Sequence, residues 1–213
     1  MDVSLGVALE AAQARIALVD AVGPHTVVDQ SRIELSTDRP DEGIATVAST
    51  LIDTERMLTQ AGHRLATIAI ESHDAGLAAS LVQTLQEAGV SDVREISSSD
   101  AVTAAVRMLS GADTAASLLA QGDTVALSIV DSAADVTSVI AVENVVDGDR
   151  FGAYRSLLGR FGEETGGATS VVVFDTLDNQ HASALSTMSP VPLQFIDDSP
   201  FALARGSALA GLR

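Results

Sequence analysis

The sequence predicts an α/β fold in which the element order βββαβαβα occurs twice. Apolar runs rich in Val, Ile and Leu alternate with stretches whose apolar residues recur at helical spacing. Glycines and prolines fall between these stretches, where turns are expected. Each unit is predicted to form a mixed sheet flanked by helices, because an opening antiparallel hairpin needs only a short loop, whereas the later strands need helical crossovers.

The first unit is predicted over residues 1–111. Three β-like runs open it, at 3–9, 13–20 and 26–35. A helix over 40–61 follows, with apolar residues at helical spacing and Gly62 as its stop. The remaining elements are predicted as a strand at 65–70, a helix at 75–88, a strand at 93–96 and a helix at 98–109 that Gly111 closes.

Residues 112–123 are small and polar, and they are predicted to be a linker. The second unit is then predicted over 124–213. Its elements are expected as strands at 124–130, 136–142 and, briefly, 143–146, a helix at 150–164 ended by Gly166-Gly167, a strand at 170–174, a weak helix at 179–186, a strand at 191–196 and a final helix from Pro200 to about Ala210.

Composition excludes several classes of function. The chain has 213 residues, 12 basic and 29 acidic side chains, and a net charge of −17; every basic residue is an arginine. Such a chain cannot neutralise a run of phosphates, so nucleic acid is not an expected partner. The absence of cysteine excludes disulfides, thiolate metal sites and cysteine nucleophiles.

No stretch approaches the roughly eighteen apolar residues of a membrane span, and the N-terminus lacks the pattern of a signal peptide. We therefore expect a cytoplasmic location. The alternative is the cytoplasmic domain of a longer, membrane-anchored protein.

Two segments carry a resemblance to a known superfamily. Residues 198–211 resemble the chaperone segment Asp-Pro-x-x-Ala-Val-Ala-x-Gly-Ala-Ala-x-x-Gly, and residues 88–105 resemble the chaperone region "AAGL…vrlinEPtAAAlAY". Together with the doubled element order, they make the chain similar to the actin, sugar-kinase and seventy-kilodalton heat-shock chaperone superfamily. The resemblance implies two tandem ribonuclease-H-like units, here in a minimal form without large insertions. The whole chain also resembles an uncharacterised actinobacterial family of chaperone-like N-terminal domains.

The resemblance implies a nucleotide site whose residues can be compared with this chain. In the superfamily, ATP lies between the units, the opening hairpin of each unit cradles its phosphates, and carboxylates orient magnesium. The first hairpin should carry Asp-x-Gly; Ser4-Leu5-Gly6 matches it, with the glycine kept and the carboxylate lost. The second should carry Asp-x-Gly-Gly-Gly-Thr. Its match at 131–138 keeps Asp131, loses every glycine and adds Asp135 where phosphate is expected.

Three other features of the chain also lack the residues that the superfamily uses to bind or hydrolyse ATP. Ser98 matches the catalytic glutamate of the superfamily, Asp175-Thr176 replaces the glycines that end the nucleotide-base strand, and the catalytic lysine has no counterpart in a chain without lysine. The sequence therefore predicts a site that does not hydrolyse ATP, with Gly6, Asp131 and Gly206 as its remaining nucleotide-binding residues. Neither ATP nor magnesium is an expected cofactor, and no metal site is predicted.

The function that follows is a pseudo-ATPase acting as a protein-interaction or regulatory module, with a basic protein as partner because the chain is acidic. One alternative is an atypical ATP-dependent phosphotransferase of small molecules with a magnesium site at Asp131 and Asp135, or a weak nucleotide sensor. The other is a structural homodimer.

Several motifs also have a purely structural interpretation. Asp131 suits ordinary turn chemistry, and residues 97–100 suit either a phosphorylation site or a helix N-cap. Residues 147–149 lack the rest of a calcium loop and are expected to form a turn, and the four histidines lack metal-site spacing. The aromatic helix face at 151–161 suits either the core or a docking surface.

Overall fold

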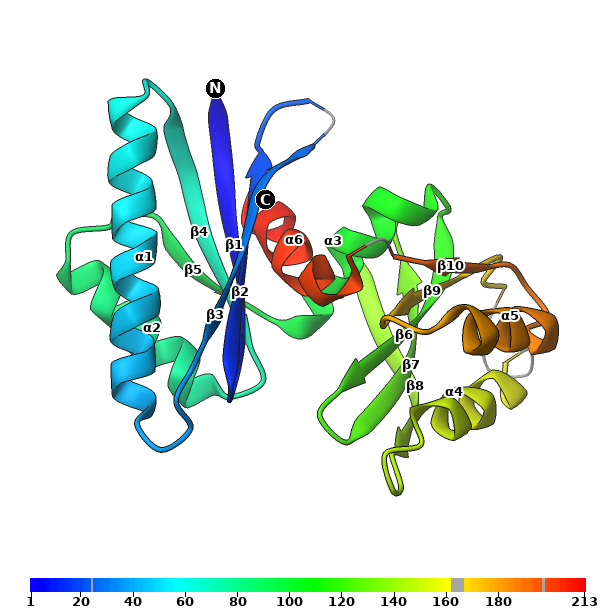
Figure 1. Cartoon of the computed structure of the whole chain (residues 1–213). Helices are drawn as coiled ribbons and strands as arrows, with labels where there is room; N and C mark the ends of the chain where they lie inside the picture. The colour runs from blue at the N-terminus through cyan, green and yellow to red at the C-terminus, as the bar shows by residue number, and fades with distance from the viewer. Residues whose placement is uncertain (24, 162–166, 197) are drawn as a thin grey trace. The chain divides into compact units, whose positions relative to one another are not determined.

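The computed structural model describes residues 1–213 except 24, 162–166 and 197 (Figure 1). The chain folds as two compact units, one formed by residues 1–104 with 203–213 and the other by residues 105–202. The elements are β1 (Asp2–Glu10), β2 (Gln13–Asp20), β3 (Val27–Glu34), α1 (Pro40–Gln60), β4 (Arg64–Ser72), α2 (Ala75–Glu87), β5 (Val93–Ile96), α3 (Ser98–Ser110), β6 (Thr114–Gln121), β7 (Thr124–Asp131), β8 (Val136–Asn144), α4 (Arg150–Gly159), β9 (Val171–Phe174), α5 (Asn179–Met188), β10 (Leu193–Phe195), the 3₁₀ helix η1 (Ser199–Phe201) and α6 (Ala202–Ala210).

The first unit contains a five-stranded sheet in the order β3-β2-β1-β4-β5. Its central strand β1 pairs antiparallel with β2 and parallel with β4. Alternate side chains of β1 point to opposite faces of the sheet. One set packs with α1 and α2 in an apolar core, whose fully buried members include Val3, Val7, Leu51, Ile68 and Leu81.

The other face of this sheet holds α6. Ala8, Ala17, Ala204 and Ala208 form a core of small side chains there. A side chain on Gly6 would lie 1.8 Å from the carbonyl oxygen of Ala204, so only glycine allows the helix to approach this closely. The last helix of the chain therefore completes the core of its first unit.

The second unit repeats this arrangement. Its five strands lie in the order β10-β9-β6-β7-β8, with β6 antiparallel to β7 and parallel to β9. Its main apolar core contains residues of β6, β7 and β9 together with α4 and α5, among them Leu118, Leu127, Tyr154, Leu157 and Leu185. The predicted α/β class and the doubled βββαβαβα order are thus confirmed.

The predicted boundaries need three corrections. The predicted linker 112–123 contains β6, the central strand of the second sheet, so the second unit does not begin at 124. The predicted third strand at 143–146 shares only its first two residues with β8. Finally, 203–213 packs with the first unit rather than with 124–202. The ending predicted for the helix at 150–164, with Gly166, lies outside the described residues.

Alanine and serine explain the missed strand. Alanine is depleted in strands and serine is common in turns, so the Thr-Ala-Ala-Ser opening of β6 resembles a linker. Burial of both faces of β6 and pairing on both sides override that local preference.

In the described part of the chain, we find no helix with both the length and the apolar character that crossing a membrane requires.

Candidate functional site

In the first unit, three parallel strands end close together. Leu9 near the end of β1 lies beside Ser72 at the end of β4, and Glu71 lies beside Ile96 at the end of β5. The turn of the opening hairpin, Ala11-Ala12, follows β1 directly. Ligands of open α/β sheets bind at the carboxyl ends of the strands, where the chain order reverses. This end of the sheet is therefore the candidate site of the unit.

Glu71 is the most unusual side chain at this end. It is only 2% exposed, and it accepts a hydrogen bond of 2.5 Å from the hydroxyl of Ser98 at the start of α3. Burial raises the pKa of the Glu71 carboxyl; the hydrogen bond from Ser98 and the nearby His73 oppose this effect, and the charge of Glu10 adds to it. The fold thus keeps the Glu71 carboxyl group buried, with the Ser98 hydroxyl as its hydrogen-bond donor.

The opening hairpin itself ends in a carboxylate. Glu10 precedes the two-residue turn, forms an ion pair with Arg15 and accepts a 2.9 Å hydrogen bond from the Gln13 amide. At the start of α3, Ser97 accepts a 3.1 Å bond from the backbone N–H of Asp100, which is the N-cap interpretation of residues 97–100.

The opening hairpin of the second unit is β6–β7, with Gly122-Asp123 as its turn. At the end of β9 lies Asp175, which accepts hydrogen bonds of 2.8 Å from the Tyr154 hydroxyl and from the backbone N–H of Thr176. Arg150 lies 3.5 Å from the same carboxylate. Burial and the charge of Asp175 raise the pKa of the fully buried Tyr154.

The structure places Asp131 in a different turn, between β7 and β8. Asp131 pairs with Thr114 at the amino end of β6, whereas the β6–β7 hairpin closes the other end. The prediction that residues 131–138 form the opening hairpin of this unit is therefore wrong. The Asp131 carboxylate accepts bonds of 3.0 and 2.9 Å from the backbone N–H groups of Ala133 and Ala134, and Asp135 forms a 3.1 Å ion pair with Arg107.

Gly6 also lies away from a turn. It sits within β1, four residues before the end of the strand, between Ala17 and Ala69. The Ser4 hydroxyl donates a 2.7 Å hydrogen bond to the carbonyl oxygen of Ala208 in α6. Gly206 is buried within α6. The Ser4-Leu5-Gly6 segment and Gly206 thus belong to the contact between β1 and α6.

The comparison with the superfamily missed Glu71 and identified Asp175 only as a departure from its glycines. A simple signal marks both: each follows a buried apolar run, Ile68-Ala69-Ile70 in one case and Val171–Phe174 in the other. A polar side chain placed directly after such a strand lies at the edge where sites form.

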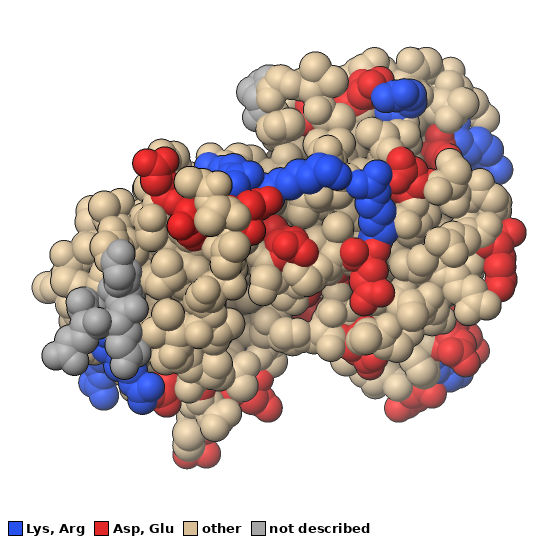
Figure 2. Space-filling view, turned by 180° about the vertical axis from the view of Figure 1, so that it is seen from behind, with Lys and Arg blue, Asp and Glu red and all other residues tan. Residues whose placement is uncertain are grey.

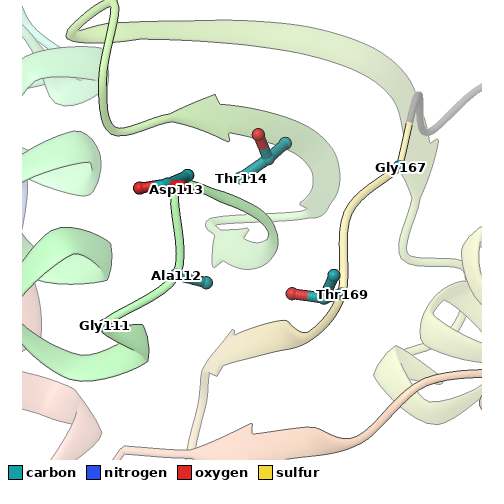
Figure 3. A pocket seen from close by; sticks show the side chains of 6 residues that line it. All are labelled: Gly111, Ala112, Asp113, Thr114, Gly167 and Thr169. Atoms are coloured by element: carbon teal, nitrogen blue, oxygen red, sulfur yellow. The ribbon is translucent and has the colours of Figure 1, made fainter.

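A shallow depression of about 390 Å³ lies at the other end of the second sheet (Figure 3). Asp113 is the single charged group among its lining residues, which are Gly111, Ala112, Asp113, Thr114, Gly167 and Thr169. It adjoins the amino ends of β6 and β9, opposite the edge where the fold places ligands. Within the described ranges, no group of three or more His, Asp or Glu side chains is arranged to hold a metal ion.

Two sheets of this strand order, each opening with a hairpin, define the actin-like ATPase fold, and solved structures agree. The chain is similar to the ROK hexokinase of Thermus thermophilus (TM-score 0.62, 13% identity, covering 98% of this chain and 97% of that one). It is also similar to the ethanolamine utilization protein EutJ of Carboxydothermus hydrogenoformans, with a TM-score of 0.64 and 14% identity over 97% of this chain and 89% of that one. A third similar structure is component A of the (R)-2-hydroxyglutaryl-CoA dehydratase of Acidaminococcus fermentans, with a TM-score of 0.61 and 12% identity over 100% of this chain and 98% of that one.

At these identities the likeness shows the fold alone. Residues 2–213 match the family model DUF7159, a family of unknown function, and the chain belongs to this family. No curated protein matches it.

Proposed function

We propose that the chain is a non-catalytic member of the actin-like ATPase fold that acts as a protein-binding module. The observation that carries this proposal is the same in both units: each opening hairpin has a two-residue turn with a carboxylate, Glu10 in one and Asp123 in the other. In this fold class, the opening hairpins are the elements that bind the phosphates of the nucleotide.

Two-residue turns offer few backbone N–H groups, because most of those near the turn pair within the hairpin ladder. The first turn, Ala11-Ala12, contains no glycine, and the second contains only Gly122. A phosphate that approached the second turn would meet the like charge of Asp123, whereas at the first turn Glu10 is already paired with Arg15. Two like charges about 4 Å apart near a protein surface repel by about 4 kcal/mol at an effective dielectric constant of 20.

The carboxyl groups at the strand ends support the same proposal, because they already have partners. Ser98 donates to Glu71, and Tyr154, Arg150 and the Thr176 N–H surround Asp175. A magnesium ion needs carboxylates with free oxygens in a near-octahedral arrangement. These hydrogen bonds occupy Glu71 Oε1 and both oxygens of Asp175, which leaves fewer lone pairs for an ion, and we propose neither ATP nor magnesium as a cofactor.

A basic protein is the proposed partner. At least nine of the 12 arginines form ion pairs within the chain, which leaves the surplus of acidic groups at the surface. In Figure 2 acidic side chains are spread over the visible face, and arginines lie beside some of them. An acidic surface accelerates encounter with a positively charged one.

Isothermal titration of the whole chain with ATP and ADP, each with and without magnesium, tests the nucleotide part. We expect no heat of binding up to about 1 mM nucleotide, a concentration that would reveal even a complex of about 4 kcal/mol. Thermal unfolding in the same mixtures should show no rise in Tm. Micromolar binding accompanied by release of phosphate would overturn the proposal.

The phosphotransferase alternative has its own discriminating variant. A metal-dependent ATPase signal that is lost in Asp131→Ala but kept in Asp38→Ala, an exposed acidic residue in the first unit, would establish it. We expect no such signal in either variant or in the unchanged chain.

The partner part is tested with a defined arginine- and lysine-rich peptide. We expect association at low salt that weakens as salt screens the charges, since the Debye length falls from about 30 Å at 0.01 M to about 8 Å at 0.15 M. No association at the lower salt concentration would mean that the charge serves solubility alone.

A further inference from the structure

The edges of the two sheets differ in how they are protected. An edge strand presents unpaired N–H and C=O groups, and proteins guard it by shortness, charge, proline or bulges. The edge strands β5 and β10 have only four and three residues. The long edge strands are β3, with eight residues, and β8, with nine.

The long edge strands β3 and β8 can be compared directly, since they occupy the same place in their sheets. Each has one irregularity in its pairing with the neighbouring strand. However, β3 carries the charged residues Asp29, Arg32 and Glu34. In β8, by contrast, residues 136–142 read Val-Thr-Ser-Val-Ile-Ala-Val, without a charge or a proline. Among the four edge strands, β8 is therefore the long one with seven consecutive residues that include neither a charge nor a proline.

The valines of this stretch are exposed. Val136, Val139 and Val142 have exposed fractions of 50%, 59% and 53%. Such a long, apolar edge is a template for pairing with another strand.

The charges that flank the stretch are neutralised within the same unit. Asp135 pairs with Arg107 at 3.1 Å, and Glu143 pairs with Arg160 at 2.8 Å and accepts a 3.0 Å bond from Ser156. In a chain with a net charge of −17, residues 136–142 thus form an uncharged strip.

We propose that β8 pairs with β8 of a second copy of the chain, antiparallel and about a two-fold axis. Charge selects this occupant, because a second copy offers the same uncharged strip, whereas a basic segment would be drawn to the acidic surface elsewhere. An antiparallel register with Val139 opposite its own copy places two β-branched side chains together at the two-fold axis. Cross-strand pairs of β-branched residues stabilise a sheet, and a two-fold interface uses the same patch on both copies.

Sedimentation of the whole chain over about 1–100 μM, without nucleotide, tests this pairing. We expect monomer at the low end and mostly dimer at the high end. In Val139→Lys, two lysines would face one another at the axis, and the dimer should weaken at least tenfold. The matched control is Val28→Lys on β3, whose valine is 46% exposed, and it should dimerise like the unchanged chain.

A measurement on the unchanged chain guards against misfolded variants. Amide hydrogen exchange should slow in β8 as the concentration rises, while exchange in β3 stays constant. A monomer at every concentration would overturn the proposal. So would a dimer that Val139→Lys leaves as tight as before, or one whose concentration-dependent protection lies outside β8.

Discussion

The two units share one strand order but end their strands with different chemistry. In the first unit, a single hydroxyl, that of Ser98, holds the buried carboxyl of Glu71. In the second, Asp175 receives the Tyr154 hydroxyl, a backbone N–H and a nearby arginine. In the first unit, burial raises the pKa of the Glu71 carboxyl itself, whereas in the second unit the raised pKa belongs to the donor, the Tyr154 hydroxyl.

This difference shows that pairing and packing, rather than strand-end residues, maintain the repeated topology. Each sheet keeps an apolar central strand, β1 or β6, with an antiparallel neighbour on one side and a parallel one on the other. The residues at the ends of those strands differ between the two units within the same strand order.

The largest expected effect comes from Gly6→Ala, which affects only the first unit. The new methyl group would meet backbone atoms of Ala204 and Ala208 at 1.8 and 2.4 Å, so α6 would have to move away from β1. We expect a loss of about 3 kcal/mol or more in the free energy of unfolding, at the upper end for overpacked cores.

Denaturant unfolding measures this loss. The control is Gly159→Ala in α4, where a methyl group meets nothing within 4 Å and the free energy should change by less than about 1 kcal/mol. Equal stability of the two variants would mean that α6 does not pack on β1.

A smaller effect is expected in the second unit from Tyr154→Phe. This variant keeps the ring in the core and removes one hydrogen bond to a carboxylate, so we expect a loss of about 1–2 kcal/mol. Ser156→Ala, on the same helix, removes an exposed bond to Glu143 and should cost under about 0.5 kcal/mol. If both variants unfold alike, the Tyr154–Asp175 bond contributes nothing to the stability of the unit.

The smallest effect is one of pH, and it comes from Glu71→Gln. Because the pKa of Glu71 is raised in the folded state, the folded chain binds more protons than the unfolded chain at pH values above 4.5, the ordinary value, up to the raised one. Stability therefore falls as pH rises through this window. Glutamine does not ionise, so Glu71→Gln does not lose this stability, and its Tm should exceed that of the unchanged chain at pH 7. The difference between the two Tm values should shrink toward pH 4.

Thermal melts across this range measure the difference. Glu95→Gln, an exposed residue of the same sheet, is the control and should show no such trend. A constant difference between Glu71→Gln and the unchanged chain at every pH would rule out a linked proton at Glu71.

Local sequence signals predicted most of the architecture. Runs such as Ile68-Ala69-Ile70 and the helical spacing within α1 determine their elements locally, and both lie where they were expected. The failures have one common cause: they depend on partners distant in the chain. Thr114–Gln121 is a strand because strands on both sides pair with it.

The site was harder to predict for the same reason. Glu71 and Ser98 are 27 positions apart, and no motif joins them. The turn at Gly122-Asp123 did carry a local hairpin signal, since a glycine followed by an aspartate separates two apolar runs. The comparison with the superfamily favoured Asp131 over this signal, because it matched a residue type rather than a place in the sheet.

The bond from Ser4 to Ala208 joins residues 204 positions apart. During synthesis β1 would therefore leave the ribosome long before α6, and the small side chains on that face of the sheet would remain exposed to water until α6 followed. Contacts of such long sequence separation slow folding. The strand β1 is thus made well before the helix that covers it, and its unit should reach its fully buried state only after α6 has been made.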